Sequence, residues 1–253
     1  MIHKRVIPCL LLRQGGLVKT RKFSEPQYIG DPVNAIRIFN DKEVDELMVL
    51  DITASKEGNA PDFGLIEEFA GECFMPLTYG GGICEVAQAR QLFASGVEKI
   101  CLQTAILDDL SLVSRLSDQF GSQSILISVD LKKNRFGKHQ LYSASRGKTL
   151  FKDWRSFIQQ AVLAGAGEIV LNAVDRDGMM EGMDLELIEK AAASVSVPII
   201  AMGGAGSMSD IKAAVDAGAS AVAAGAFFVF HGPHRAVLIT YPRYEQIKEV
   251  LGS

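Results

Sequence analysis

The sequence predicts an α/β fold, a (β/α)8 TIM barrel built from two duplicated half-barrels. The chain has 253 residues, close to the roughly 250 of one such barrel. Short β-rich runs alternate with segments of helical period, which is typical of βαβ units around a parallel sheet. Motifs of the first half also recur in the second half. We therefore expect a single domain over residues 1–253, with half-barrels of about 1–120 and 121–253.

The alternation predicts eight strands, each followed by a helix. The strands are expected at Arg5–Leu11, Glu46–Asp51, Met75–Tyr79, Lys99–Leu102, Ser124–Asp130, Glu168–Asn172, Pro198–Met202 and Ala221–Ala224. Helical period follows in segments such as DPVNAIRIFND, DFGLIEEFAGE, DDLSLVSRLSDQF, DWRSFIQQAVLAG and SDIKAAVDAG. Several of these segments open with Asp or Ser, which favour the N-cap position.

The internal repeat favours a closed barrel over an open doubly wound sheet. The segments MPLTYGGGI and GVEKICLQTA recur as VPIIAMGGAGS and GASAVAAGAF. Gly81 precedes Thr104 by 23 residues, and Gly204 precedes Ala226 by 22. A repeat of this length indicates a duplicated half-barrel.

Two insertions interrupt the regular spacing, Arg13–Gly30 after the first strand and Lys132–Thr149 after the fifth. Both follow a strand, so both belong to the face on which barrel enzymes carry their active sites. We expect them to be long loops that serve as lids.

Glycine clusters after two of the strands predict phosphate binding. Glycine lets backbone N–H groups approach an anion, and a following helix N-terminus adds a favourable dipole. One such cluster alone is equally typical of a tight turn, but here each is followed one βα unit later by a second small-residue segment. The expected phosphate-binding residues are Gly81, Gly82, Thr104 and Ala105 in the first half and Gly178, Gly203, Gly204, Gly225 and Ala226 in the second.

Carboxylates at the ends of predicted strands are candidates for acid–base chemistry. Asp51, Asp130, Asp175 and Asp177 hold such positions. Asp130 ends the apolar run ILISVD, where nothing local compensates its burial, so a raised pKa is expected. Asp51 is followed by ITAS and is expected to cap the next segment instead. Asp130 and Asp177 are therefore favoured for chemistry.

Composition excludes several other functions. A net charge of −4 without a basic run gives no electrostatic footprint for nucleic acid. No stretch approaches the ~18 consecutive apolar residues of a membrane span, and MIHKRVIPCLLL lacks a following cleavage site, so we expect a cytoplasmic protein. The four histidines lack metal-ligand spacing, so neither metal nor cofactor is expected. Cys9, Cys73, Cys84 and Cys101 lack CxxC spacing and are expected in the core.

Four charged residues begin predicted strands: Arg5, Glu46, Lys99 and Glu168. The ordinary interpretation is that strand ends are solvated and that this end of a barrel contributes stability. Alternatively, the four side chains converge on the barrel axis as a ring of ion pairs. The sequence leaves both interpretations open.

The motifs KRVIPCL, GDPV, DELMVLDITAS, YGGGI, VDRDG, GGAG and AGASAVAAGAF, in this order, resemble the cyclase subunit of imidazole glycerol phosphate synthase, the HisF family, over nearly the whole chain. The resemblance implies a lyase that takes ammonia from a glutaminase partner docked on the bottom face and acts on an elongated bisphosphate. It assigns Lys19, Asp130 and Asp177 to catalysis, and Arg5, Glu46, Lys99 and Glu168 to an ammonia gate.

The sequence departs from that family at the end of the first strand, where Leu11 replaces a catalytic aspartate. Gln103 stands in place of Asn, Ala226 in place of Ser, and Met179 in place of a small polar residue. The tail FHGPHRAVLITYP is similar to paralogues that accompany surface-polysaccharide biosynthesis. Three hypotheses follow: an ammonia-using synthase subunit, a non-catalytic scaffold that passes ammonia to an amidinating enzyme, and a phosphosugar isomerase. Leu11 argues against the isomerase as strongly as against the synthase, because the isomerase of this barrel type also uses the strand-one aspartate. The four charged residues at the strand starts favour the first two hypotheses, since an isomerase has no use for them.

Overall fold

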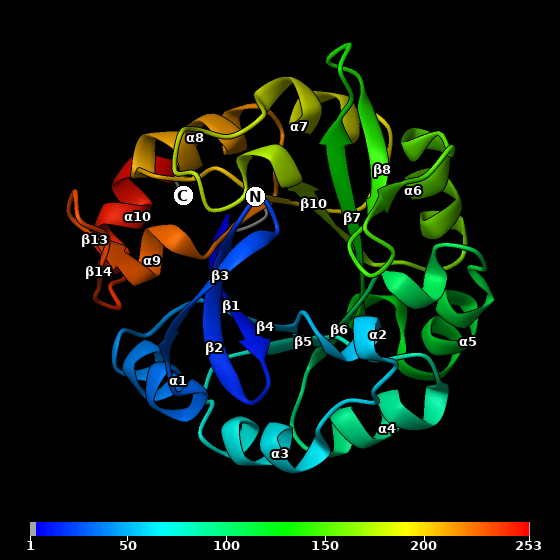
Figure 1. Cartoon of the computed structure of the whole chain (residues 1–253), viewed down its shortest axis with the longest axis horizontal. Coiled ribbons are helices and arrows are strands. Elements are labelled where there is room, and N and C mark those ends of the chain that lie inside the picture. The colour runs from blue at the N-terminus through cyan, green and yellow to red at the C-terminus, as the bar shows by residue number, and fades with distance from the viewer. Residues whose placement is uncertain (1–3, 253) are drawn as a thin grey trace.

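A computed structural model describes residues 4–252 and confirms the closed (β/α)8 barrel. Eight parallel strands form the ring seen end-on in Figure 1, and β7 pairs with β10 as well as with β6. The barrel strands are β1 (Arg5–Arg13), β4 (Leu47–Asp51), β5 (Leu77–Gly80), β6 (Lys99–Leu102), β7 (Ile125–Lys133), β10 (Glu168–Ala173), β11 (Ile199–Met202) and β12 (Ala221–Ala224). Each predicted strand is present, with bounds that differ by a few residues at most.

Helices surround the barrel on all sides (Figure 1). They are α1 (Pro32–Asp41), α3 (Phe63–Gly71), α4 (Val86–Ala94), α5 (Ser111–Phe120), α6 (Trp154–Leu163), α7 (Leu185–Ala192), α8 (Met208–Asp216) and α10 (Tyr244–Leu251). Side-chain N-caps begin five of them; the capping residues are Asp31, Asp62, Asp153, Asp184 and Ser207. The first three confirm the sequence prediction, whereas Ser207 and not Ser209 caps α8, and α5 begins without a side-chain cap. Such caps satisfy backbone N–H groups that have no partner within the helix.

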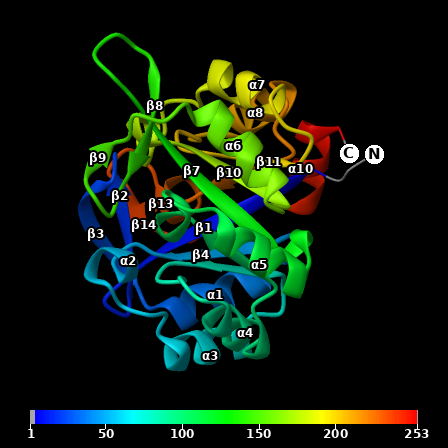
Figure 2. The ribbon, with the colours of Figure 1, turned by 90° about the vertical axis from the view of Figure 1, so that its right-hand side faces the viewer.

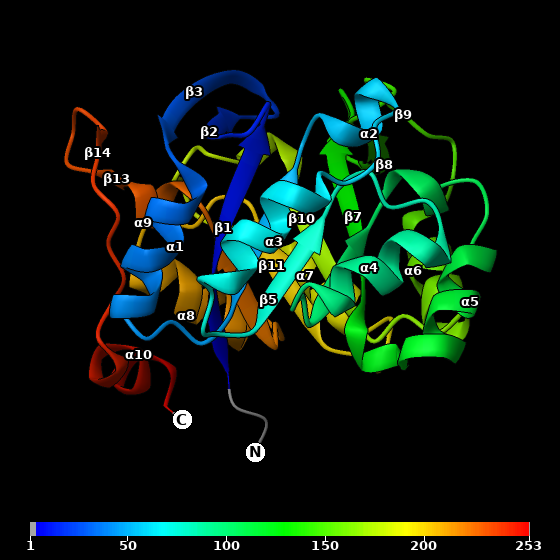
Figure 3. The same ribbon diagram turned by 90° about the horizontal axis from the view of Figure 1, so that it is seen from below.

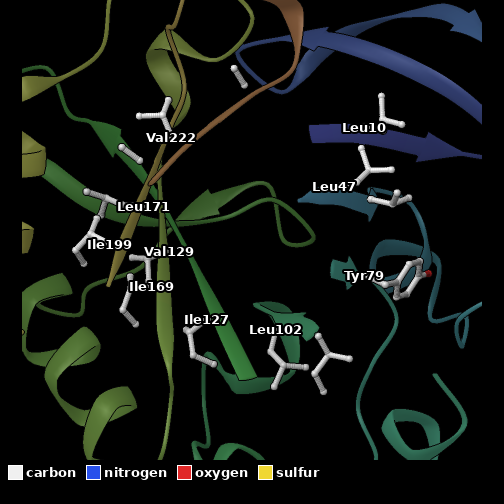
Figure 4. Close-up of a cluster of buried hydrophobic side chains, with 14 of the residues drawn as sticks. Leu10, Leu47, Tyr79, Leu102, Ile127, Val129, Ile169, Leu171, Ile199 and Val222 are labelled. Atoms are coloured by element: carbon white, nitrogen blue, oxygen red, sulfur yellow. The ribbon is translucent and has the colours of Figure 1, made fainter. Parts of the chain in front are cut away.

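Alternation along the strands separates two apolar layers. On β1, Val6, Leu10 and Leu12 pack outward beneath the helices, whereas Ile7, Cys9 and Leu11 point into the barrel. The outer layer is the larger one, and Figure 4 shows part of it between the barrel and its helices. Because side chains alternate with a period of two, each strand serves both layers.

The two insertions are antiparallel β-hairpins, which corrects the expectation of loops. The first contains β2 (Gly16–Arg21) and β3 (Ser24–Gly30), and β2 continues the sheet from the end of β1. The second contains β8 (His139–Ser143) and β9 (Lys148–Thr149) on an extended β7. Both rise from the same end of the barrel, and the described chain ends lie at the other (Figures 2 and 3). Backbone pairing therefore orders both insertions.

Short elements complete the ends of the barrel. The helices α2 (Ala54–Glu57) and α9 (Ala226–Val229) follow β4 and β12 directly. The turns η1 (Thr104–Ile106), η2 (Ser122–Ser124) and η3 (Val174–Arg176) are 3-10 helices, and β13 (Phe230–His231) pairs with β14 (Ala236–Val237). The helix α9 occupies the place of the short extra helix of phosphate-binding barrels.

Candidate active site

The C-terminal ends of the barrel strands enclose a cavity of about 390 Å³, counting the part that opens to solvent. Its wall comes from β1, β2, the segment after β10, and the segments after β11 and β12. The lining residues include Leu11, Lys19, Thr20, Asp177, Gly178, Gly203, Gly204, Gly225 and Ala226. Lys19 and Asp177 of the predicted catalytic set thus share one cavity with the second-half phosphate-binding residues. Asp130 and the first-half phosphate-binding residues are not among those that line it.

Lys19 is buried at this cavity on β2 and donates from Nζ to the carbonyl oxygen of Cys9. Burial lowers the pKa of Lys19, and the nearby negative charge of Asp177 opposes this effect. A Cβ at Gly225 would overlap Lys19 Nζ. Gly225 therefore leaves the space that the ammonium group fills, a role that sequence spacing did not predict.

Asp130 lies at the mouth of the barrel on β7 and is 6% exposed. Burial, and then the negative charge of Asp177, raise the pKa of Asp130 to about 7, as the sequence led us to expect. Local compensation nevertheless exists, which corrects the prediction, because Ser128 Oγ donates to Asp130 Oδ1 at 3.4 Å. From farther along the chain, Gln103 Nε2 donates to Asp130 Oδ2 at 2.9 Å. A carboxyl group that is partly protonated near neutral pH can act as acid or base.

Gln103 is the residue of this site that motif reasoning assigned no role. Its Nε2 also donates to the carbonyl oxygen of Tyr142 at 3.2 Å, and its Oε1 accepts from Thr104 Oγ1 at 3.0 Å. Gln103 therefore ties Asp130 to the second hairpin. Its place directly after β6 was the available signal, since strand-end residues face the mouth of the barrel.

Asp177 is buried and accepts from Thr20 Oγ1 at 3.2 Å. Burial raises the pKa of Asp177, while the Lys19 charge opposes the rise. The other two candidate carboxylates have structural partners. Asp51 accepts from the backbone N–H groups of Thr53 and Ala54 at 2.8 and 3.0 Å, as its expected capping role requires, and Asp175 accepts from the N–H of Lys133 at 2.6 Å.

The first glycine cradle, Gly81, Gly82, Thr104 and Ala105, lies at the ends of β5 and β6. Gly81 and Gly82 have φ of 119° and 74°, conformations that favour glycine. A Cβ at Gly81 would lie 2.5 Å from the carbonyl oxygen of Asp51. The N–H of Gly82 donates to Ser55 Oγ at 3.1 Å, and Thr104 Oγ1 contacts Ser145 Oγ of the second hairpin at 3.3 Å.

The second glycine cradle, Gly178, Gly203, Gly204, Gly225 and Ala226, repeats this geometry at the ends of β10, β11 and β12. Gly203 and Gly204 have φ of 94° and 106°. A Cβ at Gly203 would lie 2.7 Å from the carbonyl oxygen of Ala173. Gly203 follows Ala173 by 30 residues, as Gly81 follows Asp51 by 30. Both cradles are thus shaped by the close approach of a neighbouring strand end.

Leu11 is buried on β1, 7% exposed, and lines the cavity together with Lys19. Its register partners are Leu50 on β4 and Val18 on β2. The wall that faces Asp130 and Asp177 from β1 is therefore apolar. No carboxylate from β1 joins the two on β7 and after β10.

The opposite end of the barrel carries the four charged residues as a closed ring of ion pairs. Arg5 lies 2.6 Å from Glu46 and 2.6 Å from Glu168, and Lys99 lies 3.1 Å from Glu46 and 2.9 Å from Glu168. Burial favours neutral Glu168, but hydrogen bonds from Arg5 and Lys99 outweigh it and lower the pKa of Glu168. The structure thus favours the ring over separately solvated strand ends.

Two expectations about individual residue types are wrong. Cys9 and Cys101 are buried, but Cys73 is half-buried and Cys84 is exposed, because both of the latter lie in turns before and after β5. His139 belongs to the second insertion, which was expected to be a loop, but it lies on β8, where its Nε2 is 3.0 Å from Asp184 Oδ2. His3 lies outside the described residues.

Within residues 4–252, no group of three or more His, Cys, Asp or Glu side chains could hold a metal ion. In the same part of the chain, no helix is both long enough and apolar enough to cross a membrane.

Fold and site together define a (β/α)8 barrel with buried carboxylates and paired glycine cradles at its C-terminal face. Residues 5–233 match the histidine biosynthesis protein family. A protein of Pseudomonas aeruginosa provisionally named imidazole glycerol phosphate synthase subunit hisF2 is 53% identical over 96% of this chain and 97% of its own.

Two further relatives extend the comparison. A Leptospira interrogans protein provisionally named subunit HisF is 46% identical over 99% of both chains. The imidazole glycerol phosphate synthase subunit HisF of Alkaliphilus metalliredigens is 37% identical over 97% of this chain and 96% of its own. The chain belongs to the histidine biosynthesis protein family, and its similarity to HisF proteins indicates a cyclase-type enzyme of the lyase class.

Proposed function

We propose that this chain is the synthase subunit of a glutamine amidotransferase of the imidazole glycerol phosphate synthase type. Ammonia enters from a glutaminase docked on the face of the ion-pair ring and reacts with a phosphorylated ligand at the opposite face. The ring of Arg5, Glu46, Lys99 and Glu168 carries this proposal. We place this complex of synthase and glutaminase in the cytoplasm.

The ring is suited to gating because each cation contacts both anions. Breaking one contact leaves a buried charge that has lost a partner, which is costly, so the ring favours a closed state unless a docked partner compensates. Beyond it, the barrel interior is apolar, with Ile7, Met48 and Val170 among its residues. An apolar interior admits neutral ammonia more readily than ammonium ion.

The two glycine cradles support a ligand with a phosphate group at each end. They occupy the two halves of the same face, and Asp130, Asp177 and Lys19 lie between or beside them. Asp130, which exchanges its proton near neutral pH, is the candidate acid or base toward the incoming nitrogen. Lys19 and Asp177 supply charge at the second cradle.

A second candidate function, the non-catalytic scaffold, is favoured by Leu11. Cyclisation requires proton transfers on both sides of the new nitrogen, and the β1 wall offers a buried apolar side chain there. In this alternative the barrel passes ammonia to an amidinating enzyme of surface-polysaccharide biosynthesis. The same apolar wall argues against a phosphosugar isomerase, which also needs a carboxylate at this position.

The test of docking and transfer uses a glutaminase subunit that co-purifies with this chain. Lys99→Glu should leave complex formation intact but release ammonia from glutamine into solution instead of transferring it, because the ring loses its alternation of charge. Lys212→Glu, on the outer surface of α8, is the matched control. Docking of the glutaminase on the glycine face, or equal effects of the two variants, would show that the ring is not a gate.

The test of phosphate binding is a crystal structure grown at high phosphate concentration. Phosphate is expected at both cradles, near Gly81 and near Gly204, because backbone N–H groups there lie at or beside helix N-termini. If both cradles remain without phosphate, the two-phosphate ligand is excluded.

A further inference from the structure

Two arginines lie at the outer edge of the second glycine cradle, each presented by a different hairpin. Arg21 is exposed at the end of β2, and Arg235 lies in the turn between β13 and β14. Their side chains are close enough for the charge of Arg21 to lower the pKa of Arg235, after the larger effect of burial. The two arginines thus lie beside the part of the cradle where the predicted ligand would end.

Arg235 contacts Gly178 of the cradle through its side chain, and Arg21 lies beside Gly178 through its backbone. Arg235 Nη2 donates to the carbonyl oxygen of Gly178 at 2.9 Å, and its guanidinium lies 4.7 Å from the centre of the Phe230 ring. On the other side, Lys22 N–H donates to the carbonyl oxygen of Asp177 at 2.9 Å, and a Cβ at Gly178 would overlap the carbonyl oxygen of Thr20. Both neighbours of Arg21 are therefore packed on the cradle.

This pair of cations lacks neutralisation by acidic side chains. In the described chain, residues 4–252, neither Arg21 nor Arg235 makes an ion pair. Arg235 uses one N–H donor for Gly178 and keeps the rest of its planar fork. Arg235 also has a φ of 51°, a backbone conformation that costs energy in a residue other than glycine. Guanidinium groups that lack an acidic partner are suited to binding an anion.

We propose that Arg21 and Arg235 form a subsite for a second phosphoryl group, joined to the phosphate in the second glycine cradle, so that the ligand carries a diphosphate at this end. This inference rests on the proposed phosphate-binding function and specifies its substrate class as a diphosphate ester. The backbone N–H groups of the cradle hold the inner phosphoryl group. The arginines hold the outer one through charge-assisted, bidentate hydrogen bonds.

The alternative occupant of the arginine pair is a carboxylate or a single phosphate. A single phosphate in the cradle already has hydrogen-bond donors in the backbone N–H groups and Lys19, so it does not need the arginines. A carboxylate could reach the arginines only through a separate carbon linker from the phosphate in the cradle. A diphosphate uses both adjacent sets of donors at once, since its two phosphoryl groups share one bridging oxygen.

Isothermal titration calorimetry of the full chain with inorganic phosphate and inorganic pyrophosphate tests the proposal. Pyrophosphate is expected to bind at least about tenfold more tightly than phosphate at fixed salt. Arg21→Gln and Arg235→Gln should each weaken pyrophosphate binding by about tenfold and change phosphate binding by less than about twofold. Arg115→Gln, an exposed arginine on α5, makes the same change of net charge and should alter neither.

Equal binding of the two anions by the unmodified chain would overturn the proposal. So would equal losses for both anions in the arginine variants, which would place these side chains at the first phosphate. A comparable loss of pyrophosphate affinity in Arg115→Gln would show that the effect comes from net charge and not from a site at Arg21 and Arg235. None of these results depends on a glutaminase or on turnover, so failure of the diphosphate subsite is distinguishable from failure of the proposed synthase function.

Discussion

The buried carboxyl group of Asp130 should make the stability of this protein fall as the pH rises. Its pKa is raised from 3.8 to about 7 by burial and by the charge of Asp177. The folded state therefore favours the protonated form, and this contribution is complete below pH 3.8 and lost as the pH passes 7. A rise of this size amounts to about 4 kcal/mol, of which about 3 kcal/mol is lost between pH 5 and 8.5.

The variant Asp130→Asn keeps the shape of the side chain and cannot ionise. We expect the unfolding free energy of the unmodified protein, relative to that of the variant, to decrease by about 3 kcal/mol between pH 5 and 8.5.

Urea denaturation followed by circular dichroism at several pH values measures this difference. Asp118→Asn, which neutralises an exposed carboxylate on α5, is the matched control and should give a difference that varies little with pH. A difference for Asp130→Asn that stays constant with pH, or that grows toward low pH, would refute the argument that burial controls this carboxyl group.

Three further outcomes are expected. Leu11→Asp should raise turnover of the family bisphosphate by about 10²–10⁴-fold if only the missing carboxylate limits the reaction; no gain in a steady-state assay would favour the scaffold. Gly225→Ala should displace Lys19 from the Cys9 carbonyl oxygen, seen by crystallography, and lower the free energy of unfolding by about 1–3 kcal/mol, measured by denaturation. Gly71→Ala, at a glycine with open space for a Cβ, should cause neither change. Asp184→Ala removes an N-cap, the Lys133 ion pair and the His139 hydrogen bond, so it should lower the free energy of unfolding by about 3 kcal/mol. Asp153→Ala removes only an exposed cap and should have a smaller effect; an equal loss of stability in the two variants would contradict this reasoning.

The sequence by itself determined the fold and the positions of most site residues, because both follow from local patterns. The βα alternation fixes which residues end strands, and in a closed barrel all strand ends of one kind meet at one face. Asp130, Asp177 and the glycine cradles could therefore be located before their contacts were known. Likewise, capping by Asp51 depends only on the residues that follow it within one turn.

Only the tertiary structure decided how distant groups combine. The ring of Arg5, Glu46, Lys99 and Glu168 depends on the side chains meeting across the barrel axis, and the sequence left that arrangement open. The insertions looked like loops because most of their residues are polar or glycine. They become hairpins by pairing with the ends of β1 and β7. The hydrogen bond of Gln103 to Asp130 and that of Arg235 to Gly178 join residues far apart in the chain, so no local pattern encodes them.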